Sequence, residues 1–133
     1  MLTGALQTGR VSAQEPWVAR GLKFLESHIK PDGGIYDTRH DNYTTSVALM
    51  AFVAANHDGK YNTIIANAQK FLKKIQWDED ENIKQDNPFY GGIGYASQKR
   101  PDMSNTQFAI EALKASGIKS DDPALQKALI FAS

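Results

Sequence analysis

Several side chains in this sequence that could act as general acids are grouped in one acidic run. They are Asp78, Glu79, Asp80 and Glu81. A carboxyl group serves as a general acid near neutral pH only where an apolar environment raises its pKa. Residues 78–89 are polar and acidic, so the sequence offers no apolar flank for such a shift. We therefore predict a solvated loop here and no catalytic residue.

Histidine is the second side chain that could bind a metal or carry a proton. The three histidines are His28, His40 and His57. None of them pairs with another at the short spacing that a metal site on a helix requires. The sequence has no cysteine, which removes disulfides, thiolate ligands and a cysteine nucleophile together. We predict neither a metal site nor a cofactor.

Two pairs of adjacent glycines stand close to aromatic residues. They are Gly33 and Gly34, which follow Asp32, and Gly91 and Gly92. Glycines after an aspartate are found in phosphate-binding loops, but two glycines behind Pro-Asp more often make a tight turn between helices. We predict structural turns at both places.

Composition and charge exclude several classes of protein. A length of 133 residues with 41% hydrophobic content fits one domain over residues 1–133 with a real core. Fifteen basic and fifteen acidic residues balance without forming a block, so a nucleic-acid partner is not predicted. The longest apolar run, residues 47–55, is shorter than the ~20 residues of a transmembrane helix. No targeting signal stands at the N-terminus, so the compartment is not indicated.

The chain repeats itself, and repeats determine a fold more strongly than local propensity does. A shift of 107 residues places Leu6 on Leu113, Val11 on Ile118, Pro16 on Pro123, Arg20 on Lys127, Leu22 on Leu129 and Phe24 on Phe131. A shift of 61 places residues 45–54 on residues 106–115, and Phe71 lies 60 residues before Phe131. Two kinds of helix therefore alternate, and the polar stretch after Gln76 is an insertion.

Helical periodicity predicts the elements that carry these repeats. We expect helices over residues 16–29, 44–55, 60–76 and 104–116, and a last helix that starts at Pro123 behind an Asp122 cap. The first and third place their apolar residues on one face, which is typical of outer helices. The second and fourth are rich in alanine, which permits close packing as inner helices. Strand signals are weak, so we predict an all-α fold.

Several segments resemble one known family. Residues 20–36, RGLKFLESHIKPDGGIY, resemble the QW repeat motif of the squalene/hopene cyclase superfamily. His28 or Ile29 stands where the motif has glutamine, and Ile35 with Tyr36 stands where it has tryptophan. A second copy reads AQKFLKKIQW and resumes with FYGGIGY, so it supplies Gln76. The segment RPDMSNTQFAIEALKASGI resembles an inner helix of squalene-cyclase-like repeat proteins from bacteria. The resemblance spans essentially the whole chain.

This resemblance implies an α/α toroid of helical hairpins, the fold of terpenoid cyclases and protein prenyltransferases. We count two to three hairpins, so we expect an incomplete ring that is truncated at both ends. Its apolar edges would meet the remaining repeats of the same protein or cause self-association. Cyclases of the family use an Asp-x-Asp-Asp acid motif, and this sequence has none.

In such a toroid the turns beside the aromatics would border the central cavity. The candidate ligand-binding residues are therefore Tyr36, Tyr43, Phe89, Tyr90 and Tyr95, with Asn105. An aromatic wall stabilises a cation or an apolar ligand. The alternative is that the rings only pack the helix ends and that Asn42, Asn105 and Gln107 only cap the inner helices.

We interpret the chain as a non-catalytic or catalytically incomplete squalene-cyclase-like module, which binds an apolar, isoprenoid-like molecule or acts as a scaffold. One alternative is a terpenoid cyclase whose acid motif lies outside these residues, so whether the full-length protein is an enzyme stays open. Another is an α-solenoid interaction module with a concave groove.

Overall fold

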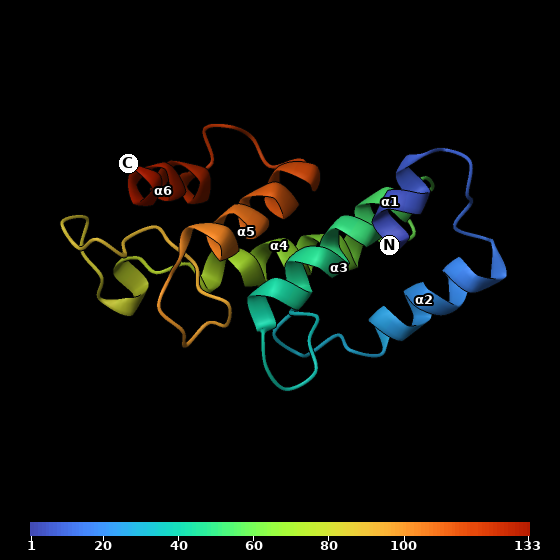
Figure 1. The fold of residues 1–133 in the computed structure, drawn as a ribbon, viewed down its shortest axis with the longest axis horizontal. Helices are drawn as coiled ribbons and strands as arrows, with labels where there is room; N and C mark the ends of the chain where they lie inside the picture. Colours follow the sequence, from blue (N-terminus) through green and yellow to red (C-terminus); the bar gives the residue numbers. More distant parts are fainter.

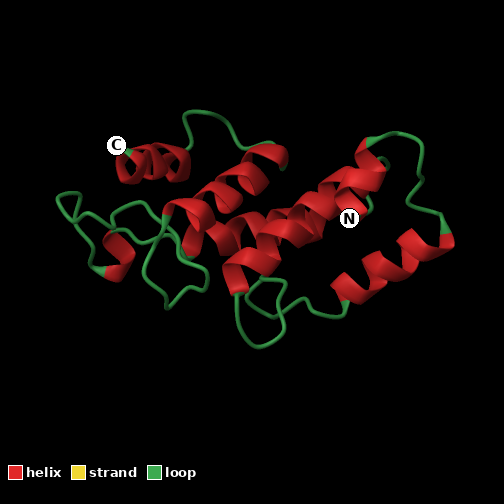
Figure 2. Cartoon of the chain, in the orientation of Figure 1, coloured by secondary structure: helices red, strands yellow, loops and turns green.

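The structure, a computed structural model, describes residues 1–133 and contains helices and turns without a strand (Figure 2). The helices are α1 (Leu2–Gln7), α2 (Pro16–Glu26), α3 (Asp41–Ala55), α4 (Asn62–Lys74), α5 (Met103–Ala115) and α6 (Pro123–Ala132), with a short 3-10 helix, η1 (Glu79–Glu81). The only strand-like feature is an isolated bridge between Ile29 and Ile35. The predicted all-α class is confirmed.

The helices form an inner and an outer layer. Figure 1 shows that α3 and α5 lie side by side and run in the same direction. Helix α1 packs against the C-terminal end of α3. On the outside, α4 covers α3 and α5, α6 packs on α5, and α2 contacts α3. The arrangement is two outer-to-inner pairs, α2–α3 and α4–α5, with α1 and α6 at the two ends. It agrees with the predicted alternation of helix types and with a toroid-type domain.

The inner layer supplies most of the core because its small residues allow close approach. Eight of the fifteen residues of α3 are buried, among them Ala48, Leu49 and Phe52. On α5, Ala109, Ala112 and Leu113 are completely covered. The alanines predicted to permit close packing therefore lie at the contact between α3 and α5.

Several predicted helix ends differ from the structure: α4 is shorter by two residues at each end, α5 is shifted by one residue, and two other ends differ by three residues. The first outer helix ends at Glu26 instead of residue 29, because Ile29 leaves the helix to pair with Ile35. The first inner helix begins at Asp41, three residues early, after His40 adopts a left-handed φ of 62° and accepts a hydrogen bond from the Thr44 hydroxyl. The start of α6 is as predicted, since the Asp122 carboxylate accepts the Ala124 N–H at 2.9 Å.

The repeat register has a structural counterpart in two threonines. Thr45 Oγ1 accepts the N–H of Ile35 at 2.8 Å, and Thr106 Oγ1 accepts the N–H of Ile93 at 2.9 Å. Each hydroxyl also donates to the carbonyl of the same isoleucine. The same contact therefore fixes each glycine turn to the inner helix that follows it. None of the helices is both long and apolar enough to cross a membrane.

Candidate functional site

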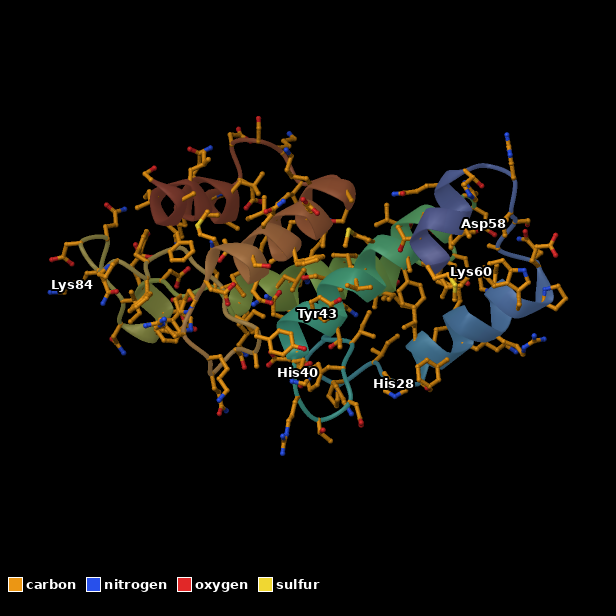
Figure 3. The ribbon with its side chains drawn as sticks, viewed as in Figure 1. His28, His40, Tyr43, Asp58, Lys60 and Lys84 are labelled. Carbon is orange, nitrogen blue, oxygen red and sulfur yellow. The ribbon has the colours of Figure 1, made fainter.

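Three of the predicted aromatic residues gather where α3 and α5 begin. The rings of Tyr43 and Tyr95 lie 5.7 Å apart, and His40 packs on Tyr95 at 4.2 Å between ring centroids. Figure 3 shows His40 and Tyr43 next to each other at the start of α3. Tyr36 lines the same cleft as His40 and Tyr95.

This cleft lies between the loop before α3 and the loop before α5, and its volume is about 420 Å³. Its walls are mostly polar, with Arg39 and Lys99 beside the aromatic rings. Asp41 joins the two loops, because its carboxylate accepts the N–H and the hydroxyl of Ser97 at 2.7 and 2.6 Å. An apolar ligand would have to displace water from charged groups here, so the cleft is a poor place for one.

The amides near the helix starts do not act alike. Asn42 is fully buried, and its amide donates to the carbonyls of Gly94 and Asn105 at 2.8 and 3.2 Å. The expected capping role is therefore wrong for Asn42, which instead ties α3 to the turn and helix of the next repeat. The Asn105 amide donates to Asp102 at 2.7 Å, and Gln107 donates to Glu111. Both side-chain amides therefore have a hydrogen-bond partner, and neither offers an unpaired group to the cleft.

The first glycine turn is the predicted structural turn. The Asp32 carboxylate accepts the N–H of Gly34 at 2.8 Å and the hydroxyl of Tyr36 at 2.7 Å. The hydrogen bond to Asp32 raises the pKa of Tyr36 to about 12, because ionisation would place a phenolate beside the carboxylate. The Tyr36 ring also stacks on Phe71 of α4 at 5.7 Å. Tyr36 therefore fastens the turn as well as lining the cleft.

Phe89 and Tyr90 lie apart from the other aromatics. Phe89 packs edge-on against Trp77 at 6.1 Å, with Arg100 over its ring. Tyr90 is 1% exposed, and its hydroxyl donates to Glu79 at 2.7 Å. The five predicted aromatics therefore divide between the cleft and the turn behind α4, and they do not form one wall.

The acidic run is solvated as predicted at Glu79, Asp80 and Glu81, which are exposed, and the expectation is wrong only for Asp78. Asp78 is 8% exposed and caps η1, and Lys127 of α6 contacts it at 2.7 Å and Glu79 at 2.8 Å. Hydrogen bonds from Lys127 and Tyr90 lower the pKa of Glu79 to about 2, so it is ionised and cannot donate a proton. Partial burial of its carboxyl group raises the pKa of Glu81, although the residue as a whole is exposed.

A second hollow, which the sequence did not indicate, lies between α5 and α6. This α5–α6 groove has a volume of about 540 Å³, and seven of its eleven lining residues are hydrophobic. Ile110 of α5 and Leu125 and Leu129 of α6 line it, together with Met103 and Ile118. Leu129 is 60% exposed although its repeat counterpart Leu22 is 1% exposed. Both positions carry leucine, so no signal in the sequence distinguishes them, and only the structure locates the groove.

The chain offers no cluster for a metal ion, since no group of three His, Asp or Glu residues gathers at a suitable place. The two hollows are therefore the candidate sites. Of these, the α5–α6 groove suits an apolar occupant and the cleft near Tyr36 suits a polar one.

Comparison with known proteins gives one match. The family model described as the squalene-hopene cyclase C-terminal domain matches residues 2–132. No curated protein and no solved structure matches the chain.

Proposed function

Because this chain belongs to the squalene-hopene cyclase C-terminal domain family, we propose that it is a cyclase-like module that binds an apolar, isoprenoid-like molecule without transforming it. The observation that carries the proposal is the α5–α6 groove. Its volume of about 540 Å³ lies within the usual range for small-molecule sites, ~300–1,000 Å³.

The chemistry of the groove favours a hydrocarbon over a polar ligand. Ile110, Leu125 and Leu129 form its walls, and Lys114 is the one charged residue that lines it. Burial of apolar surface contributes ~25 cal/mol per Å², so a chain of isoprene units gains affinity along its whole length. The polar edge at Gln107 and Ser120 suits a single hydroxyl head group.

The proposal that the module does not transform its ligand rests on the acidic residues of this chain. Protonation of an alkene needs a strong, dry acid, and the sequence has no Asp-x-Asp-Asp motif. The one acidic run lies outside the groove, and Lys127 binds its Asp78 and Glu79. The hydrogen bonds that Glu79 accepts lower its pKa to about 2, so Glu79 holds no proton for a substrate.

Farnesol, an isoprenoid alcohol, is a suitable probe, and calorimetric titration at low protein concentration measures its binding. We expect Leu129→Lys to weaken binding about tenfold or more, because loss of one buried leucine costs ~1.5–3 kcal/mol. The matched control is Lys84→Glu, which changes an exposed residue that does not line the groove. Equal affinity of Leu129→Lys and the unchanged chain, or no binding at all, would refute the groove as the site. Incubation with squalene tests the second part of the proposal, the non-catalytic role. A cyclised product would refute it.

A further inference from the structure

We propose that the polar cleft between the loops before α3 and α5 binds a small aromatic carboxylate. Both walls of the cleft come from the middle of the chain, from residues 36–41 and residues 95–99. Its volume of about 420 Å³ lies within the usual range for small-molecule sites, ~300–1,000 Å³. The cleft shares no lining residue with the α5–α6 groove, so this inference goes beyond the proposed function and does not rest on it.

Two cations that line the cleft have no acidic partner. They are Arg39, on the loop before α3, and Lys99, on the loop before α5. The three salt bridges of the chain all lie around α6, and neither of these two residues takes part in one. A guanidinium group in a cleft suits a carboxylate, because its N–H groups match the two oxygens in position and charge. The two walls therefore each present a cation that a bound anion can pair with.

The one acid that lines the cleft is already occupied. The Asp41 carboxylate accepts the N–H and the hydroxyl of Ser97 at 2.7 and 2.6 Å, and the N–H of Asn42 at 2.8 Å. With histidine counted as neutral, two cations and one acid leave the lining with an excess of one positive charge. This excess matches the single charge of a carboxylate. The second charge of a phosphate ester would meet the repulsion of Asp41.

Aromatic rings complete the lining and favour a ligand that carries a ring of its own. The rings are those of Tyr36, His40 and Tyr95. His40 packs on Tyr95 at 4.2 Å between ring centroids, and Tyr95 is still 40% exposed, so part of its ring is free to contact a ligand. A planar ring that packs there gains the attraction of an aromatic pair in addition to buried area. A carboxylate without a ring would leave this part of the cleft unused.

The backbone of His40 supports a role for its ring. Its φ of 62° is left-handed, a conformation that glycine adopts freely and that a side chain makes unfavourable. Asn82 is the one other non-glycine residue with a positive φ, and asparagine tolerates this conformation better than most residues. Strained residues of this kind cluster at ligand sites. We attribute the histidine to its ring, which glycine would not supply.

The walls of the cleft are fixed before any ligand binds. The contact between Asp41 and Ser97 holds the two loops together. Behind them, each glycine turn is hydrogen-bonded to the following inner helix through a threonine. Arg39 and Lys99 therefore extend from loops whose bases are already held in place. A preformed site of this kind loses less binding free energy to ordering than a flexible one does.

Titration with benzoate, followed by amide NMR shifts, tests the site. We expect saturable shifts for residues 38–41 and 96–99 at about pH 8, where an ordinary imidazole is neutral. Arg39→Gln and Lys99→Gln should each weaken benzoate binding about tenfold, because each removes a hydrogen bond between charged groups. Lys84→Gln is the matched control, since it makes the same change of charge at an exposed residue outside the cleft. Cleft variants that bind benzoate as tightly as this control does would overturn the site.

His40→Gly tests the ring without disturbing the backbone. Glycine accepts the left-handed conformation, so the variant should fold like the unchanged chain, which circular dichroism checks. We expect it to bind benzoate several-fold more weakly and to bind acetate as the unchanged chain does, since acetate has no ring. Benzoate binding that does not change in this variant would overturn the role of the ring.

Three further probes separate the parts of the ligand. Benzyl alcohol keeps the ring without the charge, acetate keeps the charge without the ring, and phenyl phosphate adds a second charge. Each should bind more weakly than benzoate. Acetate or benzyl alcohol that binds as tightly would overturn the combination of ring and carboxylate. Tighter binding of phenyl phosphate would overturn the carboxylate class.

Leu129→Lys separates this inference from the proposed function. The variant should bind benzoate like the unchanged chain, because Leu129 lies in the groove and does not line the cleft. Arg39→Gln should bind farnesol like the unchanged chain for the converse reason. Farnesol binding without benzoate binding refutes the carboxylate site alone. Benzoate binding without farnesol binding refutes the groove alone.

Discussion

At the scale of single residues, the two glycine turns show how closely successive repeats approach. Gly33 has a φ of 90°, and a Cβ there would lie 2.7 Å from the carbonyl oxygen of Asn67 in α4. Gly91 has a φ of 81°, and a Cβ there would overlap the carbonyl oxygen of Lys127 in α6. Each turn therefore packs against the backbone of the next outer helix. Only glycine meets both demands, a left-handed backbone and contact without a side chain.

Gly91→Ala should destabilise the chain more than a left-handed backbone alone explains. The left-handed conformation costs a non-glycine residue ~1–2 kcal/mol, and forced overlap in a packed contact costs a further ~1–3 kcal/mol. Gly117→Ala is the matched control, because Gly117 has a φ of 92° but no neighbour within 4 Å of an added Cβ. Denaturant unfolding of both variants measures the difference. Equal losses would mean that α6 shifts freely away from the turn.

At the scale of the elements, Gln76 connects three of them. It follows α4, is 2% exposed, and its amide donates to the carbonyls of Gly91 at 2.8 Å and Ala124 at 2.9 Å. One side chain thereby holds the end of α4, the second glycine turn and the first turn of α6. In the first repeat the corresponding position is Ile29, which pairs with Ile35 through the backbone. The glutamine expected from the repeat motif thus joins repeats where it is present.

Gln76→Met keeps the length of the side chain and removes both donated hydrogen bonds. Because two buried carbonyls lose their partner, we expect a loss of ~1–3 kcal/mol in the free energy of unfolding. Gln126→Met is the control, since Gln126 is exposed and donates to one carbonyl, that of Ser120. Its effect should stay within ~0.5 kcal/mol. Chemical unfolding curves compare the two, and a neutral Gln76→Met would show that water replaces the amide.

The elements were predictable from local pattern, but the partners of single polar residues were not. Periodicity located the inner and outer helices, and Asp122 before Pro123 located the start of α6. An amide such as Asn42 near a helix start looks the same in sequence whether it caps that helix or reaches another one. The burial of Asp78 depends on Lys127, which lies 49 residues away in the chain. The groove depends on what does not pack against Leu129, and no local pattern encodes a missing neighbour.

At the scale of the whole molecule, burial is uneven from one end to the other. Eight of fifteen residues are buried in α3, but only Val18 and Leu22 of the eleven in α2. Contacts that hold α2 in place come mainly from α3 and from Leu2 of α1, which fills the space beside Gly21. Helices with few buried apolar contacts open locally at a lower free energy than the core does. The end of the molecule that carries α2 is therefore less stable than the core around α3.

Amide hydrogen exchange should reveal this gradient. We expect the amides of α2 to exchange much faster than those of α3, because local opening exposes α2 without disrupting the core. Protection of α2 that is equal to that of α3 would contradict the gradient.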